Sequence, residues 1–200
     1  MKLRYLIISL IILSITSLFV GVSELSLNDI FSLTEDQRDI LWHSRIPRLI
    51  SILIAGMSMS IVGLIMQQLS RNRFVSPTTA GTLDSAKLGI LVALLMFTSA
   101  SPLAKMTLAF LFALAGTFIF MKLLEKIKFK DTVFIPLVGL MFGNIISSLA
   151  TFLAYKNNLI QNISSWMLGD FSMIMSGKYE LMFISIPILA LAFLFANKFT

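Results

Sequence analysis

The chain contains no cysteine among its 200 residues, which excludes a disulfide framework, a thiolate metal site and a cysteine nucleophile. Charged residues are also scarce: they make up 13% of the chain, whereas a soluble domain has roughly 25%. Hydrophobic residues make up 57% and gather in long runs. This composition rules out an ordinary soluble domain and predicts an all-α polytopic membrane protein with the lipid bilayer as its solvent.

Six apolar segments are candidates for membrane-spanning helices, since a helical span takes about 20 residues. They cover residues 5–22, 46–69, 88–101, 103–121, 132–155 and 180–197, and we expect one transmembrane domain over residues 1–200. The third segment is short, so its helix is expected to begin before Lys87 or to tilt. The first segment follows Lys2 and Arg4 and has features of a signal peptide, but the five spans behind it favour an uncleaved helix.

The distribution of charge predicts the orientation of these spans. One side holds the N-terminus, residues 70–87, residues 122–131 and the C-terminus, and it carries ten of the 16 basic residues and three of the ten acidic ones. The other side carries six basic and seven acidic residues. The basic excess marks the first side as cytoplasmic, so both termini are expected inside the cell membrane. Orientation also explains the positive net charge without any nucleic-acid partner.

The chain is poor in groups that could perform chemistry. No Asp, Glu, Lys, Arg or His lies deep in the six predicted spans, which argues against a proton-coupled carrier. The single histidine, His43, is expected in an exposed outer loop. Residues 56–60 nearly match a nucleophile elbow but lack its second glycine and a nearby base. We therefore expect no catalytic residue, no metal ligand and no cofactor, and any uphill transport needs energy from a partner.

Small and polar residues form stripes on the second and fifth segments, at helical steps of three and four. Such stripes either pack helices closely or face a water-filled path, and the two roles are compatible. We assign the glycines to packing and the polar residues to the path. The packing set is Gly56, Gly63, Gly139 and Gly143, and the path set is Ser60, Gln67, Asn144, Ser148 and Thr151.

Three motifs carry a resemblance to a known family. They are Arg45-Ile46-Pro47-Arg48, the run from Arg71-Asn72 through Ser76-Pro77 to Gly81, and Trp166-Met167-Leu168-Gly169. Together with the glycine spacings above, they resemble the FecCD/BtuC-type permeases, which are membrane subunits of ABC importers for ferric siderophores, haem and vitamin B12. Arg73 departs from the family, which usually has proline there. The form Asn-Arg-Phe-Val-Ser-Pro-Thr-Thr-Ala-Gly resembles the branch that serves catecholate-type siderophores.

The resemblance implies roles for particular residues. Arg45 and Arg48 match positions where permease arginines dock the acidic lobes of a binding protein; alternatively, both side chains simply snorkel at the membrane interface. Asn72 and Phe74, after the second span, and Thr132 and Val133, at the start of the fifth, match residues that narrow the path at its cytoplasmic end. We carry these four over as candidate gate residues.

The resemblance also implies partners. These are an ATP-binding cassette ATPase, a siderophore-binding lipoprotein or periplasmic protein, and a second FecCD-type permease, with a heterodimer favoured over a homodimer. Family members have about ten spans and receive the ATPase after the sixth. Six spans here therefore correspond to the first part of such a permease, so we expect the chain to be incomplete at its C-terminus and unable to transport alone.

Two other functions are weighed against the permease. A self-contained six-span S component, which captures vitamins for energy-coupling-factor importers, fits the length but does not explain the three motifs. A rhomboid-type intramembrane hydrolase is disfavoured because no predicted span holds a Ser/His pair. The sequence thus favours a non-enzymatic permease subunit that moves a ferric siderophore through the membrane.

Overall fold

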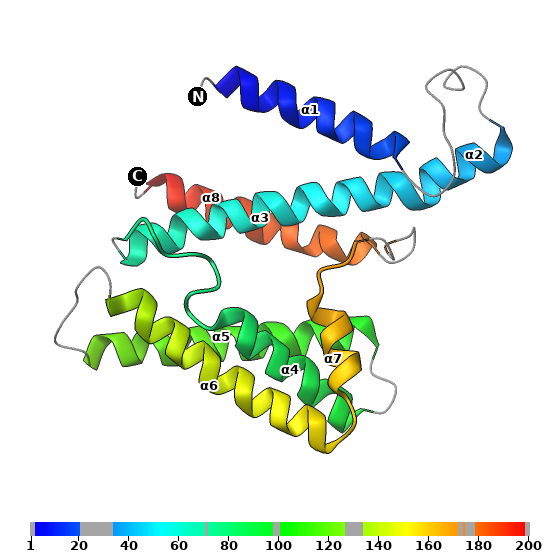
Figure 1. Ribbon diagram of the computed structural model, residues 1–200. Coiled ribbons are helices and arrows are strands. Elements are labelled where there is room, and N and C mark those ends of the chain that lie inside the picture. Colours follow the sequence, from blue (N-terminus) through cyan, green and yellow to red (C-terminus); the bar gives the residue numbers. More distant parts are fainter. Residues whose placement is uncertain are drawn as a thin grey trace. The chain divides into compact units, whose positions relative to one another are not determined.

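The computed structural model describes residues 3–20, 34–70, 72–97, 101–126, 134–171, 174 and 179–198. Every regular element among these residues is helical, as Figure 1 shows, so the predicted all-α fold class is confirmed. The elements are α1 (Leu3–Phe19), α2 (Glu35–Ile40), a π-helical turn (Leu41–Arg45), α3 (Ile46–Ser70), α4 (Thr82–Met96), α5 (Pro102–Lys126), α6 (Phe134–Lys156), α7 (Ile160–Met167), a 3₁₀ segment (Tyr179–Ile184) and α8 (Ser185–Lys198).

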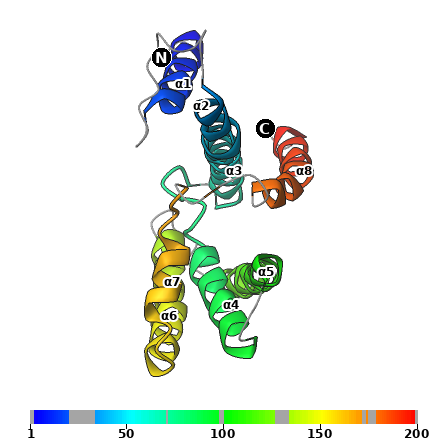
Figure 2. The same ribbon diagram turned by 90° about the vertical axis from the view of Figure 1, so that its right-hand side faces the viewer.

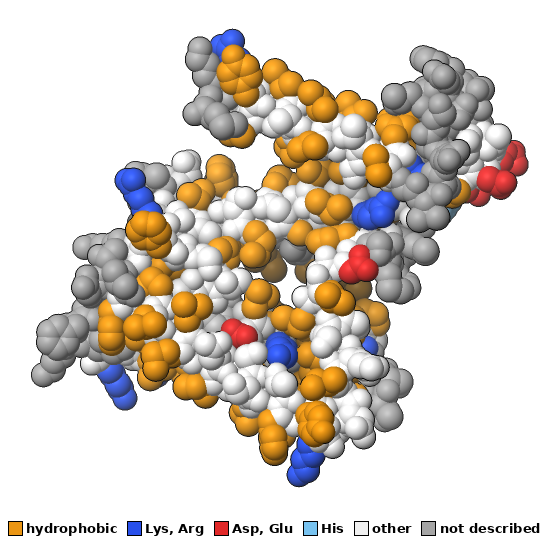
Figure 3. Space-filling model, in the orientation of Figure 1, with side chains coloured by type: hydrophobic (Ala, Val, Ile, Leu, Met, Phe, Trp, Pro, Cys, Tyr) orange, Lys and Arg blue, Asp and Glu red, His pale blue; other side chains and the backbone are white. Residues whose placement is uncertain are grey.

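Four of the described helical stretches are long and apolar enough to cross a membrane. They are Glu35–Gln68, Pro102–Lys126, Phe134–Lys156 and Glu180–Asn197, and Leu3–Phe19 is a shorter apolar helix. Figure 3 shows hydrophobic side chains over much of the visible surface. Long helices suit the hydrocarbon layer because they satisfy their own backbone hydrogen bonds there. Their apolar side chains suit it because they need no contact with water.

The chain divides into two compact units. Unit 1 comprises Met1–Ser58 and Asp170–Leu194, and unit 2 comprises Met59–Gly169 and Phe195–Thr200. In unit 1 the helical stretch starts earlier than the sequence predicted, because Thr34 caps α2. Its hydroxyl accepts from the Gln37 backbone N–H, and the Gln37 side chain accepts from the Thr34 backbone N–H. This capping box satisfies two of the helix's first donors. The helical stretch therefore begins at Glu35 and not at the predicted residue 46, and His43, expected in an outer loop, lies in the π-helical turn, where it is exposed.

Unit 2 is built around α4. Figure 2 shows α4 between α5 on one side and α6 and α7 on the other. Its core consists of Leu91 of α4, Ala150 and Ala154 of α6 and Ile163 of α7. On the α5 side, Gly116 leaves room for the Ser85 side chain, where a Cβ would collide. Alanine, glycine and serine at these contacts let the helix backbones approach closely, as is typical of membrane helices.

The segment between α3 and α4 packs against a glycine face of α6. A Cβ added at Gly139 would overlap the carbonyl oxygen of Thr79, and one added at Gly143 would lie 2.5 Å from Oδ2 of Asp84. Gly81, at the start of α4, has φ +66°, a left-handed conformation that favours glycine. The Gly139-x-x-x-Gly143 motif therefore packs against the end of this segment and the first turn of α4.

This packing places the beginning of α4 beside the middle of α6. Thr79 and Gly81 lie at Gly139 and Gly143, and Leu91 further along α4 packs near Ala150 and Ala154. Asp84 and Lys87 belong to this helix, which begins at Thr82 and so before Lys87, as one of the two expectations for the short third segment had it. The apolar run alone begins only at residue 88, because the two charges interrupt the apolar pattern that marks a span. Leaving both residues out of the charge count does not change the basic excess of the side predicted to be cytoplasmic, since one charge of each sign is removed.

The Trp166-x-x-Gly169 motif forms the end of α7. Gly169 follows the last turn with φ +65°, the left-handed conformation that commonly ends a helix. The ammonium of Lys105, in α5, lies 4.8 Å from the centre of the Trp166 ring. This cation–π contact ties the start of α5 to α7.

We predict that Gly139→Ala destabilises the protein, because the new methyl group would overlap the Thr79 carbonyl. Gly56→Ala is the matched control: the sequence assigned Gly56 to helix packing, but it is exposed and a Cβ there meets no heavy atom within 4 Å among the described residues. Overpacking costs about 1–3 kcal/mol, whereas an open helical Gly→Ala change is neutral or slightly stabilising. Thermal unfolding of the full-length protein in detergent measures both, and equal melting temperatures for the two variants would contradict the packing.

Candidate functional site

The two arginines of the Arg45-x-Pro-Arg48 motif have different surroundings in unit 1. Arg45 ends the π-helical turn and is only 3% exposed, and its Nη1 donates to the carbonyl oxygen of Leu18 in α1. Arg48 is half-buried on the first turn of α3. A π-helical turn inserts an extra residue into the helix and is frequent at functional sites. The Arg45 side chain thus holds α1 and α3 together, while Arg48 keeps part of its surface accessible.

Two of the four candidate gate residues, Asn72 and Phe74, are among the described residues of unit 2, and one is buried while the other is exposed. Asn72 is 2% exposed, and its Oδ1 accepts a hydrogen bond from the Phe74 backbone N–H at 2.8 Å. The Phe74 side chain is 91% exposed. Asn72 therefore shapes the turn that projects Phe74 outward. Thr132 and Val133, the other two candidates, lie outside the described residues.

Further hydrogen bonds fix the rest of this turn. Gln67 Nε2, one of the predicted path residues, donates to the carbonyl oxygen of Arg73 at 3.0 Å. The Ser76 backbone N–H donates to Thr79 Oγ1 at 2.9 Å, and Thr82 Oγ1 donates to the Pro77 carbonyl oxygen at 3.0 Å. A Cβ at Gly63 would lie 3.4 Å from the Pro77 ring, so the turn also packs on α3. Gly63 and Gln67, one helical turn apart on α3, thus both contact this turn.

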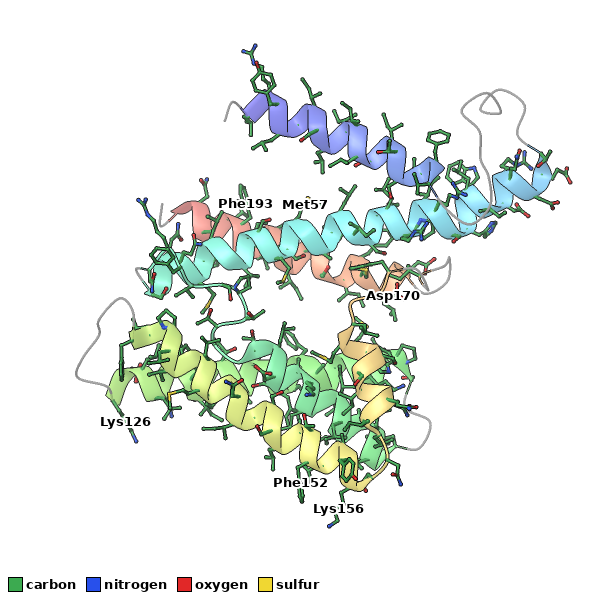
Figure 4. The ribbon with its side chains drawn as sticks, viewed as in Figure 1. Met57, Lys126, Phe152, Lys156, Asp170 and Phe193 are labelled. Atoms are coloured by element: carbon green, nitrogen blue, oxygen red, sulfur yellow. The ribbon has the colours of Figure 1, made fainter. Side chains whose placement is uncertain are left out.

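The polar stripe of α6 faces away from the unit 2 core. Asn144, Ser148 and Thr151 are exposed in this chain, whereas Gly143 and Ala150 on the adjoining face are buried. Figure 4 shows Phe152 and Lys156, further along α6, also pointing away from the rest of unit 2. Within α6, the two glycines of the packing set are thus buried and the three polar residues of the path set are exposed. Whether the outward face lines a path stays a prediction, as it does for Ser60, which is exposed on α3.

Sequence reasoning missed one residue of this region, Lys87. Its Nζ donates to Ser147 Oγ at 3.2 Å and to Thr151 Oγ1 at 3.0 Å, bridging α4 and α6. Asp84 lies one turn earlier on the same helix, and both side chains are half-buried. Figure 3 shows an acidic and a basic group side by side among hydrophobic side chains over α4 and α6. The three-residue spacing of Asp84 and Lys87 was the available signal, because it places both on one helix face.

The helical fold and these motifs are those of one transport family. The chain matches the FecCD transport family over residues 9–200 and belongs to it. This confirms the resemblance read from the three motifs. The chain is thus a multi-pass membrane protein of a transport family.

Two relatives show where the chain lies within this family. It is 66% identical over all 200 residues to the petrobactin import system permease protein YclN of Bacillus subtilis and covers 63% of that protein. It is 40% identical over 195 residues to the ferric-anguibactin transport system permease protein FatD of Vibrio anguillarum. That match covers 98% of this chain and 62% of the relative. The chain therefore spans less than two thirds of the length of these relatives.

A solved structure shows the same fold. It is described as an inward-facing conformation of a metal-chelate type ABC transporter, and it matches with a TM-score of 0.73 and 24% sequence identity. The match covers 92% of this chain and 58% of the other. At this identity the likeness establishes the fold alone.

We predict that Asn72→Leu loosens the turn between α3 and α4, because the Phe74 N–H loses its side-chain acceptor. A lost hydrogen bond of this kind is worth about 0.5–1.5 kcal/mol. Hydrogen exchange of the amides around Phe74 in the full-length protein should therefore accelerate about three- to tenfold. Thr107→Val is the control, since its hydroxyl only bonds the Leu103 carbonyl of its own helix. Unchanged exchange near Phe74 would show that Asn72 does not shape the turn.

Proposed function

We propose that the chain forms part of a permease subunit that carries a ferric siderophore, of catecholate type, across the cytoplasmic membrane. The observation that carries this proposal is the 66% identity, over the whole chain, to a petrobactin import permease. The second relative, at 40% identity, is also named for transport of a ferric siderophore. The Asn72–Gly81 turn, whose sequence resembles that branch, is a built element of unit 2 with its own hydrogen bonds.

In this proposal the chain binds and guides cargo and performs no catalysis. A partner ATPase hydrolyses ATP, an extracytoplasmic binding protein delivers the siderophore, and a second FecCD-type permease completes the path, with a heterodimer favoured. Both termini of these 200 residues lie on the cytoplasmic side, as the basic excess of the predicted loops supports. Helices rock against one another during the cycle, and Phe74 at the turn after α3 is the side chain placed to narrow the path.

The competing S-component function predicts a different behaviour. Such a subunit binds a small vitamin tightly without a binding protein. The permease proposal predicts no such binding, because selection of the cargo rests mainly with the binding protein. Tight vitamin binding by the purified chain alone would favour the S component.

The proposed function predicts binding-protein-dependent uptake. We expect the full-length protein, with its partner permease, ATPase and binding protein, to restore uptake of radiolabelled ferric catecholate siderophore to cells that lack their own permease. Omitting the binding protein or inactivating the ATPase should abolish that uptake. Uptake that persists without the ATPase, or no uptake of any ferric siderophore by the complete system, would contradict the proposal.

The surroundings of the two arginines refine the docking proposal. Arg48 is the more accessible of the two arginines of the motif, so we assign to it the contact with acidic side chains of the binding protein. Arg45 is buried against α1, and we assign it the role of positioning the helix that presents Arg48. Charges at an interface steer encounter and fix register more than they add affinity.

We predict that Arg48→Glu lowers binding-protein-dependent uptake at least about tenfold, because it turns attraction into repulsion during encounter. Arg38→Glu is the matched control, since Arg38 is exposed on α2 and the variant makes the same change in net charge. Uptake is measured at low and high salt, and the defect should be larger at low salt. Equal uptake by the two variants would remove Arg48 from the docking surface.

A further inference from the structure

A lysine that bonds to the side of a candidate membrane-spanning helix needs a physical explanation. Lys87 lies five residues into α4 and reaches Ser147 and Thr151 of α6. Thr151 is five residues, or about 8 Å, from the C-terminal end of α6 at Lys156, and Ser147 is about 14 Å from it. The ammonium is thus placed along the length of the helix and away from its end.

The local hydrogen bonds leave the Lys87 ammonium with one N–H that can be donated to a further partner. An ammonium has three N–H donors, and two of them are used by the hydroxyls of Ser147 and Thr151. Lys87 is only half-buried, and its neighbour Thr151 is exposed. Within the described residues Lys87 forms no ion pair with Asp84. The Lys87 ammonium, with one N–H donor left, therefore lies beside the polar stripe of α6, to which Thr151 belongs.

A purely structural role does not account for the charge. A neutral side chain would bridge two hydroxyls without the cost that an ionised group carries in hydrocarbon. Ionisable residues inside membrane bundles usually face a water-filled cavity or a transport path. The charge itself is explained if Lys87 attracts a ligand of opposite sign, because such attraction is stronger in a low-dielectric interior than in water.

We propose that Lys87, held by Ser147 and Thr151, is a cationic binding position for an anionic ferric chelate within the transport path. This inference rests on the proposed function. Ferric iron chelated by catecholates carries a net negative charge, so its oxygen atoms can accept the remaining N–H of Lys87. The carboxylate of Asp84, one turn earlier on α4, repels anions near Lys87 and so limits how strongly the anionic chelate is bound. A moderate attraction lets the chelate enter the path and leave it.

The first test measures charge selectivity without any siderophore. These 200 residues contain no cysteine, so in a complex whose remaining cysteines are replaced, Ser148→Cys places one thiol on the polar stripe beside the Lys87 site. In the assembled full-length complex, this thiol is treated with anionic and with cationic methanethiosulfonate reagents. Charged clefts raise local counter-ion concentration about tenfold or more. Adding Lys87→Gln should therefore lower the anionic-to-cationic rate ratio by about tenfold, and Lys87→Arg should leave it near the original value.

Controls make each outcome decisive. Ser164→Cys on α7 corrects for the intrinsic reactivity of the reagents, and its ratio should not change with Lys87→Gln. Asp84→Asn keeps Lys87 and removes the nearby negative charge, so it should raise the ratio at Ser148→Cys even if the Gln variant does not assemble. A ratio that is insensitive to both substitutions overturns the proposal. A thiol that reacts with neither reagent overturns it as well, because ions then do not reach the site.

Uptake separates this inference from the proposed function. Lys87→Gln should lower uptake of a ferric catecholate chelate about tenfold while binding-protein-stimulated ATP hydrolysis persists, and Lys87→Arg should restore uptake. Wild-type uptake by the Gln variant overturns the cationic position but leaves the permease function standing. Absence of uptake by the wild-type complex contradicts the permease function, and with it the assignment of the chelate as the ligand.

Discussion

The close approach of the Thr79–Asp84 segment to the glycine face of α6 is the contact on which the rest of unit 2 depends. Because Gly139 and Gly143 have no Cβ, the Thr79 carbonyl and the Asp84 carboxylate can lie directly against the α6 backbone. Any side chain at Gly139 would push the segment away. This contact fixes where α4 begins, and thereby which residues of α4 meet which residues of α6.

The consequences run in both directions from that contact. Towards α3, the turn carries the buried Asn72 and projects Phe74, the side chain we propose for the gate. Along α4, the same register brings Lys87 to Ser147 and Thr151 and brings Leu91 into the core with Ala150. The proposed gate residue and the proposed cationic position thus belong to one continuous segment of the chain, so movement of α4 relative to α6 would alter both together.

The sequence was most informative where one physical signal dominates. Long apolar runs predicted the helices, and the ordered motifs predicted the family. It was weaker where packing competes with composition: Asp84 and Lys87 break an apolar run, so the sequence left open whether the third helix starts before Lys87 or tilts, and the structure shows that it starts at Thr82. Arg45 shows a second limit, because its burial against Leu18 depends on a π-helical turn that no sequence pattern announces. Thr132 and Val133 stay sequence-based predictions.

The most direct test of this account is the register of α4 against α6. Lys87→Cys is paired with Thr151→Cys or, separately, with Phe134→Cys at the start of α6, in a full-length protein with no other reactive cysteine. A short bis-thiol reagent is applied, and cross-linked peptides are identified by mass spectrometry. The account predicts efficient cross-linking of Lys87→Cys to Thr151→Cys and none to Phe134→Cys. The reverse result would place residue 87 near the N-terminal end of α6 and contradict both the register and the cationic position.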